Sequence, residues 1–260
     1  MSRERGKRRH SPLRGLYGAT AALALGATAV WGLWPGGLGR EGPIRVTSGV
    51  SASGYRELSG MASDGPGWLG VLFEVATEGT LVALGLLLLW VAWSGLRGAG
   101  VRDPRLVGAV LTGVGTVVAY ATSELLKLVV DEERPCRALA GAHPVAECPP
   151  PGDWSFPSNH ATLAAALAVG LALVVPRLAA VTLPLAGAGA LLLRVLVGVH
   201  YPHDVLAGAL LGAACAAAAV LAWPRRRGPF RPAVTGTPPA ASACVPPGSG
   251  PAPHGGGTRG

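Results

Sequence analysis

Six long runs of apolar residues, nearly free of charge, dominate this 260-residue sequence. A helix that crosses the hydrocarbon core of a bilayer needs about 20 such residues in a row. Tryptophan stands at or near the ends of several runs, as is typical of helix ends at a membrane surface. The sequence therefore predicts an all-α, polytopic membrane protein with six transmembrane helices in one helical bundle, over residues 16–34, 68–93, 106–128, 158–175, 178–199 and 205–223.

The composition excludes an ordinary soluble domain. Only 14% of the residues are charged, whereas roughly a quarter are charged in a typical soluble domain. The formal net charge of +8 would suit a nucleic-acid partner if the basic residues formed one patch. They cluster between the apolar runs instead. We therefore expect no nucleic-acid partner, and the sequence indicates no obligatory protein partner.

The distribution of positive charge predicts the orientation. With the N-terminus in the cytoplasm, 15 of the 22 Lys and Arg residues fall on the inner side, as the positive-inside rule requires. We therefore expect a multi-pass plasma-membrane protein with both termini in the cytoplasm. A cleaved signal peptide is the alternative for the first run, because Ala27-Thr28-Ala29 resembles a cleavage site. The later runs would keep their orientation in either case.

Three segments follow from this pattern. Residues 1–15 are a basic cytoplasmic N-terminus, and residues 16–227 form the six-span membrane domain. Residues 228–260 contain 8 Pro and 8 Gly among 33 residues, which predicts a disordered cytoplasmic tail. Residues 35–67 are expected to form an outer loop rich in Gly and Ser, and Pro184 is expected to kink the fifth run.

Two cysteines, Cys136 and Cys148, share one predicted outer loop. An extracytoplasmic compartment permits disulfides, and a bridge is the favoured interpretation. Two free thiols are the alternative.

Ionisable groups at membrane depth are energetically costly, and they usually have a functional role. Taken singly, a Lys or Arg near a helix end extends to the headgroups, and an Asp can cap a helix. Taken together, however, six such residues fall on the outer face of the predicted topology. Three cations, two imidazoles and a carboxylate at one depth indicate a site for a multiply charged anion, built from Lys127, Arg134, His160, Arg194, His200 and Asp204.

The local chemistry favours phosphate. Ser158 is a plausible N-cap, and the free amides of Asn159 and His160 would open a helix toward an anion. Nearby cations would stabilise the charge that grows in the transition state. Asp204, four residues after His200, can orient that imidazole from the same helical face. No Walker-type loop and no carboxylate cluster suited to Mg²⁺ is evident, so no metal is expected.

Three motifs carry these residues: KLVVDEERP at 127–135, PSNH at 157–160 and LRVLVGVHYPHD at 193–204. In order and spacing they resemble the type 2 phosphatidic acid phosphatase family, which shares its site with vanadium haloperoxidases. The resemblance covers the core at 127–204 and implies the six-span fold. Asn159 stands where the family has glycine, and Leu193 where it has serine. We expect phosphate binding to survive the first change and polar support to weaken slightly with the second.

The resemblance implies a mechanism and a substrate class. His200 attacks phosphorus to form a phosphohistidine, Asp204 holds its other nitrogen, and His160 protonates the leaving oxygen. No metal or cofactor is needed. The substrate is a lipid phosphate or diphosphate on the extracytoplasmic side, with undecaprenyl diphosphate favoured, then phosphatidate or phosphatidylglycerol phosphate. A vanadium-dependent haloperoxidase-like enzyme and a non-catalytic lipid-phosphate binding or transport protein are the alternatives. The expected phosphate ligands are Lys127, Arg134, Ser158, Asn159 and Arg194.

Other ionisable residues match no motif role. Glu124 is expected to pair with Lys127 or Arg134. For Glu74 and Glu78 an interfacial position is favoured over a place at the substrate mouth. His203 is interpreted as a loop residue, and His143 as solvent-facing.

Overall fold

The computed structural model describes residues 12–36 and 42–223. This part of the chain is helical, as predicted, and its only β-type pairing is an isolated bridge between Ile44 and Glu132. The principal helices are α1 (Pro12–Gly32), α2 (Gly49–Ser63), α3 (Trp68–Gly98), α4 (Pro104–Lys127), α5 (Pro135–Ala138), α6 (Asn159–Val174), α7 (Ala179–Ala186), α8 (Leu193–Leu196) and α9 (Pro202–Ala222). Short 3₁₀ turns lie at Gly100–Arg102 and Pro176–Leu178.

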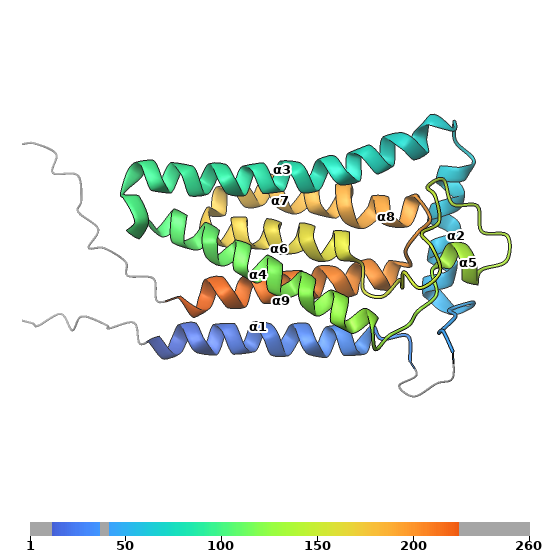
Figure 1. Cartoon of the computed structure of the whole chain (residues 1–260), viewed down its shortest axis with the longest axis horizontal. Coiled ribbons are helices and arrows are strands. Elements are labelled where there is room, and N and C mark those ends of the chain that lie inside the picture. The colour runs from blue at the N-terminus through green and yellow to red at the C-terminus, as the bar shows by residue number, and fades with distance from the viewer. Residues whose placement is uncertain (1–11, 37–41, 224–260) are drawn as a thin grey trace, which may run out of the picture. The chain divides into compact units, whose positions relative to one another are not determined.

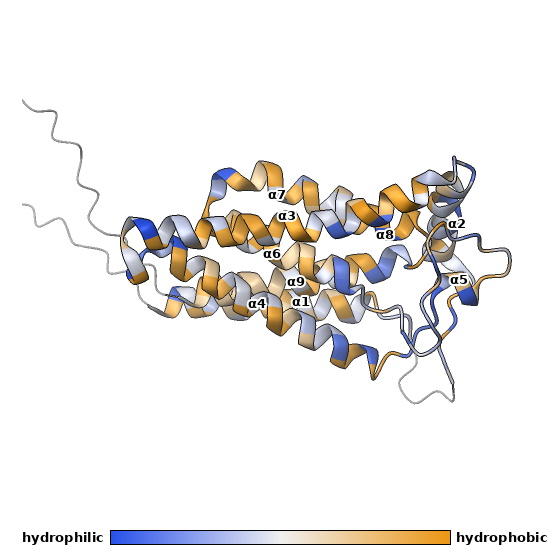
Figure 2. Ribbon diagram, turned by 45° about the horizontal axis from the view of Figure 1, so that its top comes forward, coloured by the Kyte–Doolittle hydropathy of each residue, from blue (hydrophilic) through white to orange (hydrophobic). Residues whose placement is uncertain are grey.

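Five helical stretches of the described chain are long and apolar enough to cross a membrane: Leu13–Gly32, Trp68–Gly98, Pro104–Lys127, Pro176–Leu196 and Pro202–Ala222. The chain is thus a multi-pass membrane protein. The run at 158–175 forms α6, which at 16 residues is shorter than a full crossing. The count of six spans therefore stays a prediction. Figure 2 shows hydrophobic residues along the bundle and hydrophilic residues gathered at its two ends.

Helix α9 packs against α6, α1 and α4 (Figure 1). The contact with α6 is close because glycine faces its backbone. A Cβ on Gly212 would lie 2.1 Å from the Thr162 carbonyl oxygen, and one on Gly208 would lie 2.4 Å from that of Ser158. Small residues spaced four apart allow such helix contact in membranes. This contact brings the starts of α6 and α9 together.

The expectation of a loop over residues 35–67 was wrong in part, because Gly49–Ser63 form helix α2. Its buried stripe consists of Ala52, Tyr55, Ser59 and Ala62, at helical spacing. These residues are mostly small or polar, so the stripe gives a weak hydrophobic signal in the sequence. The helix lies across the end of the bundle (Figure 1), and the Tyr55 hydroxyl donates to the Gly198 carbonyl at 3.0 Å.

The fifth apolar run is helical but irregular. Pro184 lies inside α7, and the backbone changes to a π-helix over Gly187–Leu192 before α8. The helix ends at Leu196, three residues earlier than the predicted run. At the N-terminal side, α1 already begins at Pro12, inside the segment expected to be basic and cytoplasmic. The predicted tail, 228–260, lies outside the described residues.

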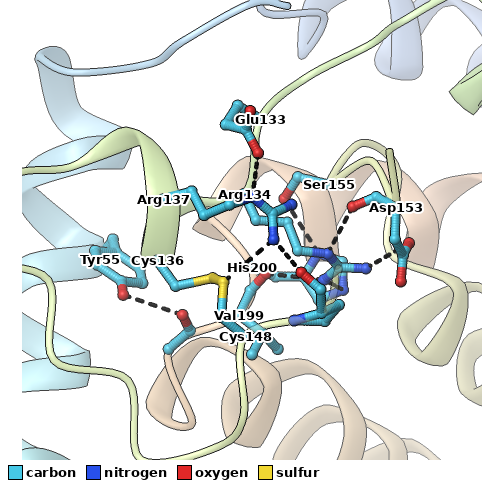
Figure 3. Close-up of a disulfide and its surroundings, with 12 residues drawn as sticks. Tyr55, Glu133, Arg134, Cys136, Arg137, Cys148, Asp153, Ser155, Val199 and His200 are labelled. Atoms are coloured by element: carbon cyan, nitrogen blue, oxygen red, sulfur yellow. Dashed lines mark hydrogen bonds and ion pairs between the residues drawn. A yellow bond between two sulfur atoms is a disulfide. The ribbon is translucent and has the colours of Figure 1, made fainter. Parts of the chain in front are cut away.

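Cys136 and Cys148 form a disulfide with Cα atoms 6.1 Å apart (Figure 3). The bridge closes the loop that follows α5. Beside it, the guanidinium of Arg137 donates to the Glu133 carboxylate and to the Pro149 carbonyl. The disulfide therefore ties together a loop whose two flanks carry Arg134 and Asp153.

Removal of this bridge is expected to destabilise the fold. Closing a loop of this length stabilises a protein by about 3 kcal/mol, so Cys136→Ser/Cys148→Ser should lower the midpoint of thermal unfolding by roughly 5 °C or more. The measurement is thermal unfolding in detergent, with and without a thiol reductant. Reductant should lower the midpoint of the wild type and of Cys215→Ser, but not that of the double variant. Equal midpoints for wild type and double variant would contradict the expectation.

Candidate active site

The residues expected to bind phosphate or act in catalysis lie at the end of the bundle that α2 and α5 cover (Figure 1). Each occupies a helix end or an adjoining turn. Lys127 ends α4, and Arg134 directly precedes α5. Ser158 is the N-cap of α6, and Asn159 and His160 are its first two residues. Arg194 lies in α8, His200 in the turn before α9, and Asp204 in the first turn of α9.

His200 is 2% exposed and lies against Arg134 (Figure 3). Nη1 of Arg134 is 3.2 Å from Nε2 of His200 and also donates to the Val199 carbonyl at 3.0 Å. A guanidinium can only donate, so Nε2 must offer its lone pair and the ring proton must be on Nδ1. Burial, reinforced by the Arg134 charge, lowers the pKa of His200 to about 3. The imidazole is therefore neutral and has a free electron pair at Nε2.

Asp204 lies behind His200, on the Nδ1 side of the ring. Its Oδ2 is 3.4 Å from His200 Nδ1 and accepts the Tyr201 amide at 2.8 Å. The Ser155 hydroxyl donates to the same oxygen. The carboxylate is fully buried. These donors hold it where it can accept a hydrogen bond from the N–H group at Nδ1 of His200. The arrangement is that of a base or nucleophile oriented by a third group.

Arg134 and Lys127 share a carboxylate. Arg134 donates from Nε to the Asp153 carbonyl and from Nη2 to Asp153 Oδ1, both at 2.9 Å. The same Oδ1 lies 3.8 Å from Lys127 Nζ. Burial alone would raise the pKa of Asp153, but Arg134 and then Lys127 lower it below its usual value. Both cations are buried, with Arg134 3% and Lys127 8% exposed. Their charged groups thus converge on one carboxylate oxygen, Asp153 Oδ1.

Two further donors in this region have no partner among the described residues: the buried Nε of Arg194 and the buried Oγ of Ser158. The backbone amide of Ser158 donates to the Asp204 carbonyl at 3.1 Å, which fixes the start of α6 beside the start of α9. Arg194 interacts electrostatically with both His160 and His200. Unpartnered buried donors are rare in folded proteins, and these two suit an oxygen-rich ligand.

His160 has its own carboxylate partner. Its Nε2 lies 2.7 Å from Oε1 of Glu78 in α3. Glu78 was expected at the interface rather than at the site, but it contacts a proposed catalytic histidine directly. Since a carboxylate accepts, Nε2 of His160 carries the proton in this contact. Arg134 and Arg194 interact electrostatically with both histidines, so the two imidazoles face the same pair of cations.

Asn159, which replaces the family glycine, joins α6 to α4. Its Oδ1 accepts the Ser123 hydroxyl at 2.7 Å, and its Nδ2 donates to Glu124 Oε1 at 2.5 Å. The same Glu124 oxygen lies 3.4 Å from Lys127 Nζ, which is one of the two pairings predicted for Glu124. The side chain of Asn159 therefore braces the carboxylate that neighbours Lys127.

Several polar residues of the site were not predicted from the sequence: Glu78, Asp153, Ser155 and His203. Asp153 and Ser155 lie in a loop without periodicity, and Glu78 reaches His160 from another helix. The interpretation of His203 as a loop residue was wrong, because it lies in the first turn of α9. His143, expected to face solvent, is exposed.

Residues 108–228 match the family model of the PAP2 superfamily. Decaprenylphosphoryl-5-phosphoribose phosphatase from Mycobacterium tuberculosis is 40% identical over 107 residues, which are 40% of this chain and 54% of that protein. Undecaprenyl-diphosphatase from Sulfolobus acidocaldarius is 34% identical over 111 residues, 43% of this chain and 52% of the relative. The chain thus matches about half the length of these curated relatives.

The fold also has a solved counterpart. It resembles the crystal structure of a transmembrane PAP2 type phosphatidylglycerolphosphate phosphatase from Bacillus subtilis, with a TM-score of 0.50 and 20% identity. The similarity covers 76% of this chain and 92% of the other. The family resemblance seen in the three motifs is confirmed: residues 108–228, which contain all three, match the family model of the PAP2 superfamily.

Proposed function

We propose that this protein is an integral membrane phosphatase that hydrolyses a lipid phosphate or diphosphate through a phosphohistidine intermediate. The observation that carries the proposal is the neutral His200, with its Nε2 lone pair, among Arg134, Lys127 and two buried donors that lack acceptors. A phosphoryl group supplies the negative oxygens that such donors require. Arg194 Nε and Ser158 Oγ would bind them, as would Lys127, Arg134 and the amide of Asn159.

In the first step, His200 Nε2 attacks phosphorus and the bond from phosphorus to the leaving oxygen breaks. Arg134 must release Nε2 as the phosphoryl group enters and bind a phosphoryl oxygen instead. His160, protonated on both nitrogens and held at Nε2 by Glu78, donates its Nδ1 proton to the leaving oxygen, which departs as the lipid alcohol or the lipid monophosphate. Asp204 stabilises the positive charge that develops on the His200 ring.

In the second step, water attacks the phosphohistidine and His160 accepts a proton from it. Inorganic phosphate leaves and His200 returns to its neutral form. The residues of this chain supply every group in both steps, so we expect no requirement for a metal ion or cofactor.

The names of two relatives support a choice of substrate class. Two are named for substrates with polyprenyl chains, decaprenylphosphoryl-5-phosphoribose and undecaprenyl diphosphate. We therefore favour a polyprenyl-linked phosphate, with undecaprenyl diphosphate first. The distribution of Lys and Arg supports six spans in the plasma membrane, cytoplasmic termini and an extracytoplasmic site. A lipid of the outer leaflet would then reach the site at headgroup depth.

The decisive experiment measures phosphate release by the full chain, purified in detergent with a chelator present. The panel contains undecaprenyl diphosphate, decaprenylphosphoryl-5-phosphoribose, phosphatidate and phosphatidylglycerol phosphate, compared by kcat/KM. We expect turnover in chelator, with the highest kcat/KM on a polyprenyl substrate. Binding of every lipid without turnover would instead support a binding or transport protein. Halide oxidation that depends on added vanadate would support the haloperoxidase alternative.

Replacement of Glu78 tests the role of His160 as acid. Glu78→Gln keeps the shape of the side chain but removes the negative charge beside His160 Nε2. We expect kcat to fall roughly tenfold, part of the 10²–10⁴-fold that acid–base catalysis typically contributes. KM should change little, because Glu78 contacts no proposed phosphate ligand through a hydrogen bond.

Glu74→Gln is the matched comparison, since it removes the same charge one helical turn away, from a residue without a hydrogen bond to His160. Its kcat should stay within about twofold of the wild type, because an exposed charge interacts only weakly with its surroundings. Equal losses in the two variants would mean that only the local potential matters, and not the contact with His160.

A further inference from the structure

Next to Asp204, on the side away from His200, lie two residues that belong to different motifs but occupy none of the fixed motif positions. Glu132 belongs to the first motif and His203 to the third. His203 Nε2 lies 3.1 Å from Glu132 Oε1 and 3.3 Å from Asp204 Oδ1. Glu132 and Asp204 are fully buried. The oxygen of Asp204 involved is not the one that faces His200, so the cluster holds the far side of the carboxylate.

The His203 ring is held from every side. The Ser51 hydroxyl lies 2.5 Å from Nδ1, and the backbone amide of His203 donates to the same hydroxyl. Ser51 therefore donates to Nδ1, which leaves the ring proton on Nε2, facing the two carboxyl groups. The rings of Phe156 and Tyr201 stack against the imidazole, with centroids 5.9 and 5.4 Å away. This side chain is thus placed with little freedom.

Glu132 is equally well placed. Its carbonyl accepts the Ser155 amide at 2.8 Å, and the backbone on either side of it pairs with Ile44. Burial and the neighbouring Asp204 carboxylate raise the pKa of Glu132 to about 8. At neutral pH its carboxyl is therefore mostly protonated, and the negative charge of the pair belongs to Asp204. Glu132 Oε1 and Asp204 Oδ1 lack a well-formed hydrogen bond in the described chain, which a proton between the two acids would supply.

We propose that Glu132 and His203 are positioning residues that hold the Asp204 carboxylate against His200. This inference rests on the proposed function, because it concerns how the nucleophile of that reaction is oriented. Glu132 shares its acid proton with Asp204, His203 Nε2 donates to Glu132 Oε2 and lies 3.3 Å from Asp204 Oδ1, and Asp204 keeps its other oxygen for His200 Nδ1. Neither residue touches a proposed phosphate ligand, so the effect is on catalysis and not on binding.

The test measures kcat and KM of the full chain in detergent for four variants. Glu132→Gln preserves the shape and hydrogen-bonding capacity of a neutral acid and should keep kcat within about twofold. Glu132→Ala and His203→Ala should each lower kcat by about tenfold or more, with KM unchanged within about twofold, on the scale of a lost orienting contact. Glu133→Gln is the matched control, since its carboxylate is buried nearby but pairs with Arg137, and its kcat should equal that of the wild type.

A background variant separates positioning from mere folding. Because Glu132 acts through Asp204, Glu132→Ala should cause no further loss of kcat in Asp204→Asn. For the same reason, the double variant of Glu132 and His203 should be no slower than the slower single variant.

Several results would overturn the proposal: wild-type kcat in Glu132→Ala, an equal loss in the Asp204→Asn background, or a Gln variant as slow as the Ala variant. The ligand atoms of Glu132, His203 and Asp204 also lie within 4.8 Å of one another. Stoichiometric zinc in the purified protein, lost together with activity in His203→Ala, would overturn it in favour of a metal site. Failure of the proposed function is distinguishable, since it requires an inactive wild type or an active His200→Ala.

Discussion

His200→Ala is expected to abolish phosphate release, lowering kcat by about 10⁴-fold or more, the scale on which enzymes lose activity with their nucleophile. The reason lies in the geometry at Nε2. Arg134 donates to this atom and so fixes the lone pair toward the cations of the site, while Asp204 lies at Nδ1. Among the described residues no other imidazole near the site is placed in this way, because Nε2 of His160 is engaged by Glu78 and Nε2 of His203 by Glu132. The loss should therefore not be compensated by a neighbour.

The measurement has two parts. Steady-state assays give kcat for the substrate with the highest kcat/KM. Rapid quenching of a reaction with that substrate, radiolabelled in the phosphoryl group that is transferred, traps the intermediate. A label that is stable in alkali and labile in acid should appear on the wild type and be absent from His200→Ala. His143→Ala is the matched control, because this exposed histidine lies in the same end region and forms no hydrogen bond in the described chain. Label on the His200 variant, or full turnover by it, would contradict the mechanism.

The parts of this fold that sequence could predict are those set by local chemistry. Apolar runs of sufficient length predicted the helices, because the bilayer requires both the apolar side chains and the internal hydrogen bonds of a helix. Ser158 is an N-cap, and the pairing of Glu124 with Lys127 follows from helical spacing. These signals involve residues within one turn of each other.

What could not be predicted depends on contacts between distant segments. Helix α2 is stabilised by packing a narrow stripe of small and polar residues, so it leaves no clear hydrophobic periodicity. Glu78 reaches His160 across 82 positions of sequence, and Glu132 reaches His203 across 71. In the sequence each of these carboxylates looks like a solvated charge. Only the fold shows that each has an imidazole as its partner.

The same distinction applies to the motifs themselves. Their fixed positions predicted which residues gather at the site, and the described structure brings those residues to one end of the bundle. Glu132 and His203, however, lie between the fixed positions, and Asn159 stands where the family has glycine. Asn159 bridges α6 to Ser123 and Glu124, a brace that glycine could not provide. In the proposed mechanism the fixed positions supply the reacting groups, and residues such as these three hold those groups or their neighbours in place.

Arg134→Lys is expected to lower kcat/KM by about 10²-fold, although it keeps the positive charge. Arg134 uses all three nitrogens at once, for the Asp153 carbonyl, Asp153 Oδ1, the Val199 carbonyl and His200 Nε2. A lysine is a single point charge and cannot reproduce this planar set of donors. Loss of one preorganised donor to a developing negative charge typically costs 10²–10³-fold.

Arg137→Lys is the comparison that decides between local geometry and general electrostatics. Arg137 lies one helical turn from Arg134, but its guanidinium binds Glu133, Cys148 and the Pro149 carbonyl and no proposed site residue. We expect its kcat/KM to remain within about threefold of the wild type, while its unfolding midpoint falls slightly. If both variants lost activity equally, the loss would not depend on the hydrogen bonds that Arg134 forms at the site, and the expectation would be wrong. A loss confined to Arg134→Lys would mean that the transferred phosphoryl group is recognised by the directions of these hydrogen bonds, because the charge itself is unchanged.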